Sequence, residues 1–251
     1  MKILKVPSSL GGLDKSGSEK APDEIEKQLK DIWLSEDYKK DNFTFSKLEF
    51  NDNDKEGFVK RLKESQADIF IGGDHSLTYY FFKSFAEKNT GLVIFDAHPD
   101  LFQEFNFPTH GDWLKFLMGE NIIKKDNIIL VGLRSFHEKE IQFLKENKIK
   151  FFTMKQIYDN LQDTCDLVME LSRQFDKFYL SIDIDVLDPA FAPGTGYIEP
   201  GGLTSRELIY FIQRLKLLKN LKKVDITEVN PNKDVNNMTS KLAARIIYEL
   251  A

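Results

Sequence analysis

The chain has 251 residues, of which 41% are hydrophobic, so it is long and apolar enough for one α/β domain with a large core. Its formal net charge of −5 argues against nucleic acid as the main partner, because phosphate binding requires a basic surface. The single cysteine, Cys165, excludes an intramolecular disulfide, and we interpret it as a packing residue of a helix.

The N-terminal sequence MKILKVPSSLGG becomes polar after six residues, which is too early for a secretory signal peptide. No apolar run approaches the roughly 20 residues needed to span a bilayer. We therefore expect a cytoplasmic protein without a membrane partner, folded as one domain over residues 1–251.

Short β-rich tracts alternate with longer tracts of helical periodicity along the chain. The predicted strands are, in order, residues 2–6, 44–50, 67–73, 91–97, 127–133, 149–152, 177–185 and 223–229. Between most of them, apolar residues recur at spacings of three and four, as in EGFVKRLKES, EKEIQFLKEN and SRELIYFIQRLKLL. In LTSRE, Thr204 or Ser205 ahead of Glu207 indicates a helix start. This alternation predicts an α/β protein with three layers (α/β/α) and an eight-stranded, mostly parallel sheet in the middle.

Polar residues stand where four of the predicted strands end. They belong to the segments IGGDH, FDAHPD, SIDID and ITEVN, and they supply imidazole or carboxylate groups. In open α/β sheets, ligands bind at the carboxyl ends of the strands. We therefore expect these four segments to meet at one edge of the sheet.

The segment SIDIDVLDPAFAPGTG combines the alternation of a strand with several carboxylates. In an extended chain, Ser181, Asp183 and Asp185 share one face. Unpaired carboxylates on a buried strand would cost on the order of several kcal/mol in desolvation, so positive charge is expected nearby. We interpret Asp188 differently, as a residue that caps the turn at Pro189.

Two of the four histidines lie in the other acidic motifs. His75 lies in GGDHS, and His98 lies in DAHPD between Asp96 and Asp100, a spacing that would aim these three side chains one way in an extended chain. The complete set of candidate metal ligands is His75, Asp96, His98, Asp100, Asp183 and Asp185. Mixed carboxylate and imidazole ligands suit Mn²⁺, Fe²⁺ or Zn²⁺. Two ions bridged by shared carboxylates would neutralise the excess negative charge, so we predict two metal ions per chain.

GGDHS, DAHPD and SIDIDVLDPAFAPGTG resemble, in the same order, the signature motifs of the ureohydrolase family of arginases, agmatinases and formiminoglutamases. The likeness continues through EPGGLTSREL and DITEVNP to MTSKLAARIIYEL, and more loosely includes VPSSLGG near the start. It implies an arginase-like fold over nearly the whole chain, with an eight-stranded sheet flanked by helices. It also implies a homo-oligomer, because family members are usually trimers or hexamers.

The resemblance further implies a site with two Mn²⁺ ions. One ion would be held by His75, Asp96, Asp100 and Asp183, and the other by Asp96, His98, Asp183 and Asp185, with Asp96 and Asp183 bridging. Glu228 in TEVNP matches the position that binds the guanidinium group of the substrate, and His110 in THGDW matches a loop histidine that shuttles protons. A metal-bridging hydroxide would attack the guanidinium carbon. Asp100 would pass a proton on and His110 would protonate the leaving amine, which gives urea and a primary amine.

The substrate is predicted from the loop between DAHPD and His110. Arginases have a Ser/Asn-rich loop there for the amino-acid end of arginine, whereas this chain has LFQEFNFPTHGDW. The spacing from His98 to His110 and the segment PGTGYIEPGGLT are more similar to agmatinases, so agmatine, cleaved to putrescine and urea in polyamine metabolism, is the leading substrate. Tyr197 stands in GYI, where agmatinases have GTP. Tyr197 and the Phe-rich residues 101–109 either shape the pocket or belong to the core.

Several alternatives stay open. A formiminoglutamase would need a basic residue for its acidic substrate, for which Arg134 is a candidate, and arginine or another guanidino acid is also compatible with the motifs. The mononuclear zinc deacetylases have a related fold and a similar Asp-x-His strand end, but they do not require His75. A metal-binding protein without turnover is an alternative of another class. We interpret His137 as an exposed helix start without a functional role.

Overall fold

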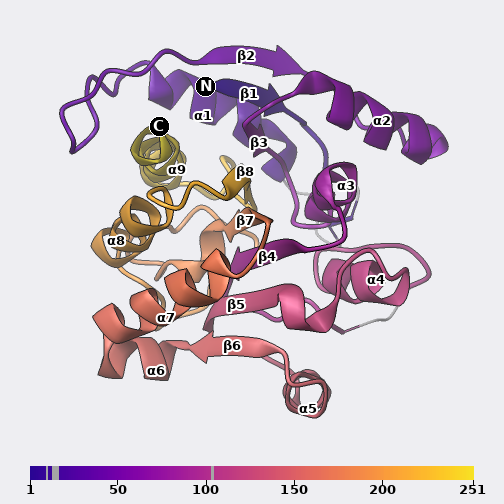
Figure 1. Cartoon of the computed structure of the whole chain (residues 1–251). Helices are drawn as coiled ribbons and strands as arrows, with labels where there is room; N and C mark the ends of the chain where they lie inside the picture. The colour runs from indigo at the N-terminus through magenta and orange to yellow at the C-terminus, as the bar shows by residue number, and fades with distance from the viewer. Residues whose placement is uncertain (10, 13–16, 103–104) are drawn as a thin grey trace.

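The computed structural model describes residues 1–9, 11–12, 17–102 and 105–251. Within them, eight strands form one sheet in the spatial order β2-β1-β3-β8-β7-β4-β5-β6 (Figure 1). The strands are β1 (Lys2–Lys5), β2 (Thr44–Lys47), β3 (Ile69–Ile71), β4 (Thr90–Phe95), β5 (Ile128–Leu133), β6 (Lys150–Thr153), β7 (Lys177–Asp183) and β8 (Leu221–Thr227). The predicted eight-stranded sheet is confirmed, and each neighbouring pair of these strands is parallel, where a mostly parallel sheet was expected.

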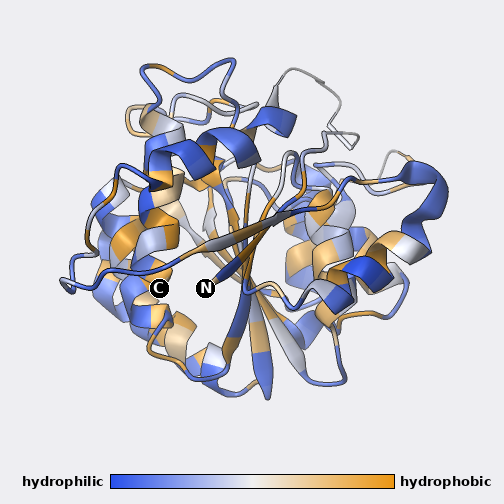
Figure 2. Ribbon diagram, turned by 90° about the horizontal axis from the view of Figure 1, so that it is seen from above, coloured by the Kyte–Doolittle hydropathy of each residue, from blue (hydrophilic) through white to orange (hydrophobic). Residues whose placement is uncertain are grey.

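Helices cover both faces of this sheet, which confirms the three predicted layers (Figure 1). One face carries α1 (Ala21–Leu29), α6 (Met154–Asp159), α7 (Leu161–Arg173), α8 (Ser205–Leu215) and α9 (Met238–Leu250), and the other carries α2 (Lys55–Ser65), α3 (Leu77–Phe85), α4 (Trp113–Gly119) and α5 (Glu138–Glu146). Seen from above, the sheet is the middle layer between the two groups of helices (Figure 2). None of the helices in the described part of the chain is long and apolar enough to cross a membrane.

The helix α8 illustrates how local sequence builds these layers. The predicted helix start at Thr204 is confirmed as a capping box: the Thr204 hydroxyl accepts from the Glu207 N–H at 3.2 Å, and the Glu207 carboxylate accepts from the Thr204 N–H at 2.7 Å. Leu208, Phe211 and Leu215 are fully buried at spacings of three and four. This spacing gives the helix one apolar stripe that packs on the sheet.

The strand predicted over residues 177–185 ends earlier than expected. β7 stops at Asp183, and Ile184–Val186 form one turn of 3₁₀ helix. The Asp183 carboxylate caps this turn by accepting the Asp185 N–H at 2.8 Å. The prediction that the strand continues to Asp185 is therefore wrong, because Asp185 lies in the 3₁₀ turn.

The four strands predicted to end in polar residues are consecutive neighbours in the sheet, in the order β3-β8-β7-β4. Because these strands are parallel, their carboxyl ends lie along the same edge. The segments GGDHS, ITEVN, SIDID and DAHPD therefore follow one another along that edge. This is the edge at which open α/β sheets bind their ligands.

Candidate active site

Three motif residues meet first at this edge: His75 after β3, Asp96 after β4, and Asp183 at the end of β7. His75 Nδ1 lies 3.1 Å from Asp96 Oδ2 and 3.3 Å from Asp183 Oδ2. The three residues are buried, with exposed fractions of 1%, 1% and 3%. One potential ligand atom from each lies within 4.8 Å of the others, so they form a candidate metal-binding cluster.

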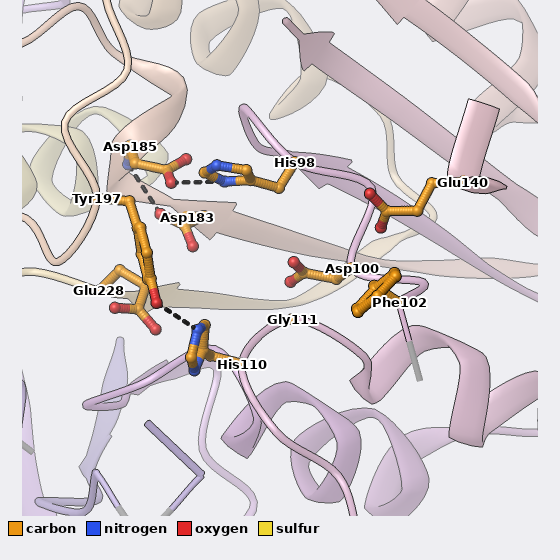
Figure 3. A pocket seen from close by; sticks show the side chains of 10 residues that line it. All are labelled: His98, Asp100, Phe102, His110, Gly111, Glu140, Asp183, Asp185, Tyr197 and Glu228. Atoms are coloured by element: carbon orange, nitrogen blue, oxygen red, sulfur yellow. Dashed lines mark hydrogen bonds and ion pairs between the residues drawn. The ribbon is translucent and has the colours of Figure 1, made fainter. Parts of the chain in front are cut away.

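A second cluster shares Asp96 with the first and adds His98 and Asp185. His98 Nδ1 lies 3.0 Å from Asp185 Oδ2 (Figure 3) and 3.5 Å from Asp96 Oδ1. The two oxygens of Asp96 therefore face different histidines, Oδ1 toward His98 and Oδ2 toward His75. Asp96 could therefore contribute a ligand atom to each cluster.

Asp100 reaches the first cluster through a backbone conformation that the sequence did not indicate. Its Oδ2 lies 2.9 Å from His75 Nδ1. β4 ends at Phe95, and Asp100 has φ 53°, in the left-handed region. The extended chain predicted for Asp96, His98 and Asp100 is therefore wrong, although the three side chains converge on one site as expected.

These contacts change the proton affinities of the clustered groups. Burial lowers the pKa of His75 and of His98, but the carboxylates around each ring outweigh burial and raise both pKa values well above the ordinary range. Burial and the charge of Asp96 raise the pKa of Asp100 to about 6. Burial, followed by the charges of neighbouring carboxylates, raises the pKa of Asp183. Without a cation, the cluster therefore holds protons on its imidazoles and on part of its carboxylates.

Two buried atoms of the clusters, His75 Nδ1 and Asp96 Oδ2, have no partner in hydrogen-bond geometry among the described residues. They lie 3.1 Å from each other, close enough for an ion pair but without the alignment of a hydrogen bond. A divalent cation between them would satisfy both atoms. The donor set of imidazole and carboxylate suits first-row divalent ions, and the carboxylate excess suits two of them. These residues therefore fit a metal centre.

A cavity of about 150 Å³ lies against the clusters (Figure 3). It is lined by His98, Asp100, Phe102, His110, Gly111, Glu140, Asp183, Asp185, Tyr197 and Glu228. Five of these residues are acidic, and none of the lining residues that the structure describes is Lys or Arg. In the absence of bound metal ions, the carboxylates of such a cavity favour cations, metal ions included.

Glu228 follows β8 and contributes a fixed carboxylate to this cavity. It has φ 62°, in the left-handed region, and its N–H donates to Gly73 O at 2.7 Å. Its Oε1 accepts from the His75 N–H at 2.7 Å. Burial and the nearby charge of Asp74 raise the pKa of Glu228 to about 8. A guanidinium cation beside Glu228 would favour its ionised form, and the carboxylate then matches the paired N–H donors of that group.

His110 lies at the cavity, as predicted, and Tyr197 lies beside it. His110 Nδ1 is 3.2 Å from Gly11 O, and Nε2 is 3.2 Å from Tyr197 Oη (Figure 3). A carbonyl oxygen only accepts, so Nδ1 carries a proton and donates to Gly11 O, and in the neutral ring Nε2 accepts from the Tyr197 hydroxyl. The two rings stack with centroids 5.3 Å apart. Tyr197 therefore fixes the ring plane of His110.

The Arginase family model matches residues 1–251 of this chain. The chain belongs to the arginase family. It is 33% identical over 204 residues to an arginase of Staphylococcus aureus, and this alignment covers 74% of the present chain and 68% of the arginase. It is 28% identical over 271 residues to a formimidoylglutamase of Bacillus subtilis, and this alignment covers 98% of the present chain and 84% of the formimidoylglutamase. A crystal structure of formimidoylglutamase from Bacillus subtilis superposes with a TM-score of 0.90 at 26% identity, over 99% of this chain and 85% of that chain.

In this arginase-family chain, the Phe-rich residues 101–109 contribute only in part to the cavity. Phe102 lines it, whereas Phe107 lines a neighbouring hollow and its ring contacts Phe105. Residues 103–104 lie outside the described residues, as do residues 10 and 13–16 of the N-terminal loop.

Arg134 does not serve as a basic residue of the cavity. Its guanidinium donates to the carbonyl oxygens of Asp185 at 2.6 Å, Glu199 at 2.7 Å and Leu187 at 3.2 Å. These bonds hold the loop that follows β7. The hypothesis that Arg134 meets an acidic substrate is therefore wrong.

Three further residues have the structural roles that the sequence indicated. Asp188 accepts N–H groups from Ala190 at 2.9 Å and Gly201 at 2.7 Å, so it fixes a turn. His137 is the N-cap of α5, and Cys165 is a buried residue of α7.

The sequence patterns did not indicate three side chains that contact the site. Ser181 Oγ lies 3.0 Å from His75 Nε2 and donates to Asp225 Oδ1 at 2.7 Å. Glu140 lines the cavity from α5, and Trp113 lies beside the first cluster. The only available signal was for Ser181, which shares a strand face with Asp183. Glu140 and Trp113 belong to ordinary helical patterns that give no functional signal.

Proposed function

We propose that this arginase-family chain is a binuclear manganese hydrolase that cleaves a guanidino compound, with agmatine as the leading substrate, to urea and a primary amine. One observation carries the proposal. Two Asp/His clusters that share Asp96, and a fixed carboxylate on Glu228, converge on a single acidic cavity.

Six residues would hold the two ions. His75, Asp96, Asp100 and Asp183 would bind one ion, and Asp96, His98, Asp183 and Asp185 the other. The orientation of the two Asp96 oxygens toward different histidines supports its bridging role. Two bound Mn²⁺ ions would supply hydroxide near neutral pH by lowering the pKa of a shared water molecule.

The remaining groups of the cavity would orient the substrate and move protons. Glu228 would bind the guanidinium group and hold its carbon within reach of attack. Asp100 would accept a hydrogen bond from the attacking water and help pass its proton on. His110 would accept at Nε2 the proton released by the attacking water and then donate it to the leaving amine, in the orientation that Tyr197 gives its ring.

Charge favours agmatine among the possible substrates. Agmatine carries a guanidinium at one end, an ammonium at the other and no carboxylate. Arginine adds one carboxylate, and formiminoglutamate carries two. Bound metal ions would neutralise Asp100, Asp183 and Asp185, which leaves Glu140 and Glu228 to repel a carboxylate, and the described lining residues offer it no Lys or Arg. Figure 3 shows Glu228 and Glu140 on opposite sides of the cavity. Glu140 accepts the Leu101 N–H at 3.0 Å and the His137 N–H at 2.9 Å, so it would contribute negative charge on its side of the cavity rather than a dedicated binding group.

A second candidate is hydrolysis of formiminoglutamate to glutamate and formamide. The observation in its favour is the match to a formimidoylglutamase over 98% of this chain. The same metal clusters could act on a formimino group, which is also a planar amidine. The position of Arg134 counts against it, because its donors are occupied by carbonyl oxygens.

A substrate panel tests the proposed function. The Mn²⁺-loaded protein is incubated with agmatine, arginine, guanidinobutyrate and formiminoglutamate, and urea, formamide and ammonia are measured. Urea release from at least one guanidino compound supports a ureohydrolase. Formamide from formiminoglutamate alone would favour the second candidate, and no product from any compound would indicate a metal-binding protein without turnover.

Binding of Mn²⁺ to the metal-free protein is expected to release protons and to strengthen as pH rises from 6 to 8. The raised pKa values of His75 and His98 mean that both rings are protonated at pH 7 in the absence of a cation, and ligation requires the loss of a proton from each. The raised pKa of Asp183 acts in the same direction. Calorimetry at pH 7 in buffers of different ionisation enthalpy counts the protons released. A proton count of zero, with an affinity that does not change with pH, would contradict the assignment.

Replacing Tyr197 by Phe is expected to lower kcat by about 2- to 10-fold with little change in KM, the range for loss of one neutral hydrogen bond. The variant keeps the ring stacked on His110 but removes the hydroxyl that contacts Nε2. Steady-state kinetics with the preferred substrate measure both constants. An increase in KM with kcat unchanged would instead make Tyr197 a substrate-binding residue.

Three expectations stay predictions. They are the cytoplasmic location, the assembly into a trimer or hexamer, and the single domain over residues 1–251.

A further inference from the structure

Trp113, the first residue of α4, is fully buried beside the first cluster. Its indole Nε1–H donates to Asp100 Oδ2 at 2.6 Å, and its ring centroid lies 4.7 Å from that of His75. The same Asp100 oxygen is 2.9 Å from His75 Nδ1. One side chain thus contacts two proposed ligands of the same ion, by a hydrogen bond to one and a ring contact with the other.

The backbone holds Trp113 in place through a tight turn. The Thr109 N–H donates to Asp112 Oδ1 at 2.6 Å, and the Trp113 N–H donates to Thr109 O at 3.2 Å. The turn also contains His110, so it joins the predicted proton donor to the indole. A buried indole N–H needs an acceptor, and here the acceptor is Asp100. The direction of this bond restricts the rotation of the Asp100 carboxylate.

We propose that Trp113 is a positioning residue that fixes Asp100 and thereby makes the two metal positions unequal. This inference rests on the metal centre of the proposed function. Among the described residues, the cluster of His98 and Asp185 has no indole donor: its contacts there include Glu199 Oε1, 3.4 Å from His98 Nε2, and the Ala97 N–H, 3.0 Å from Asp185 Oδ1. Loss of the indole N–H therefore affects one ion far more than the other.

The test is Mn²⁺ binding to metal-free Trp113→Phe, which keeps a ring beside His75 but lacks the N–H. Titration with MnCl₂ is expected to show that one ion binds about 10- to 100-fold more weakly than in the unchanged protein, the range for loss of a group that hydrogen-bonds to a metal ligand. The affinity for the other ion should stay within about 3-fold. The matched control is Trp33→Phe, because Trp33 is the other of the two tryptophans and is 83% exposed. Two unchanged affinities, or equal weakening of both ions, would overturn the proposal.

A double-mutant cycle separates positioning from general packing. If Trp113 acts through Asp100, the losses in Mn²⁺ affinity of Trp113→Phe and Asp100→Asn should be clearly non-additive. Additive losses would show that Trp113 acts elsewhere. If the unchanged protein binds no Mn²⁺, the proposed metal centre itself fails. If it binds two ions and Trp113→Phe binds them equally well, only the inference about Trp113 fails.

Fluorescence provides a test that does not require Trp113→Phe to fold. In Trp33→Phe, Trp113 is the sole tryptophan. We expect its emission to change when the metal-free protein is titrated with MnCl₂. The change should follow the binding of one of the two Mn²⁺ ions and not that of the other. An emission that is unaffected while two ions bind would contradict the placement of Trp113 at one ion.

Discussion

Replacing Glu228 by Gln is expected to lower kcat/KM for agmatine by roughly 100-fold or more, in keeping with the cost of misplacing a substrate. The amide keeps the shape of the side chain and an oxygen for the bond from the His75 N–H, which Glu228 Oε1 accepts at 2.7 Å. It removes the negative charge that matches a guanidinium group. Since the same contact binds the substrate and aligns its carbon, KM should rise and kcat should fall. Urea release at several agmatine concentrations measures the two constants.

The metal content of this variant should stay at two ions per chain, because Glu228 is not among the proposed ligands. A matched control is Glu49→Gln, which makes the same chemical change at a glutamate whose side chain is 71% exposed. Nearly full urea release by Glu228→Gln, from agmatine and from every other guanidino compound tried, would show that Glu228 does not bind the guanidinium.

Replacing Asp96 by Asn is expected to remove both metal ions and to abolish urea release. Asp96 belongs to both clusters, with one oxygen facing each histidine. His75→Ala and His98→Ala should each remove chiefly one ion, because each histidine belongs to one cluster. We expect the affinity losses to exceed the 10- to 100-fold that is typical for partners of ligands. Metal analysis after reconstitution with MnCl₂ and desalting counts the ions per chain.

Asp188→Asn is the matched control for Asp96→Asn. Asp188 lies in the same motif as Asp183, but its two oxygens accept backbone N–H groups, of which Asn keeps one, so this change weakens a turn without removing a proposed ligand. This control should retain two ions. The shared-ligand assignment fails if Asp96→Asn also retains two ions, or if each histidine variant loses both.

The sequence was sufficient to predict the layers and the residues that meet at the sheet edge. Alternating tracts of strand and helix periodicity specify a parallel α/β sheet, and parallel strands necessarily bring their carboxyl ends together. His75, Asp96 and Asp183 therefore met as predicted. The strand order was not predictable from periodicity, because it depends on contacts between residues that are far apart in sequence.

The errors have local physical causes. The alternation of period two predicted one common face for Asp96, His98 and Asp100, but the strand ends at Phe95, and a left-handed φ at Asp100 is what brings its carboxylate to His75. Arg134 was a candidate for meeting an acidic substrate. Its guanidinium instead satisfies carbonyl oxygens of a loop, a role that leaves no mark in the sequence.

The most direct test of the central claim, that an acidic cavity selects a cationic guanidino substrate, is the ratio of kcat/KM for agmatine to that for formiminoglutamate. Both values are measured on one preparation of Mn²⁺-loaded protein, through urea for agmatine and formamide for formiminoglutamate. We predict a preference for agmatine of about 100-fold or more, since repulsion between like charges costs several kcal/mol. Faster release of formamide than of urea would contradict the claim and would favour the second candidate.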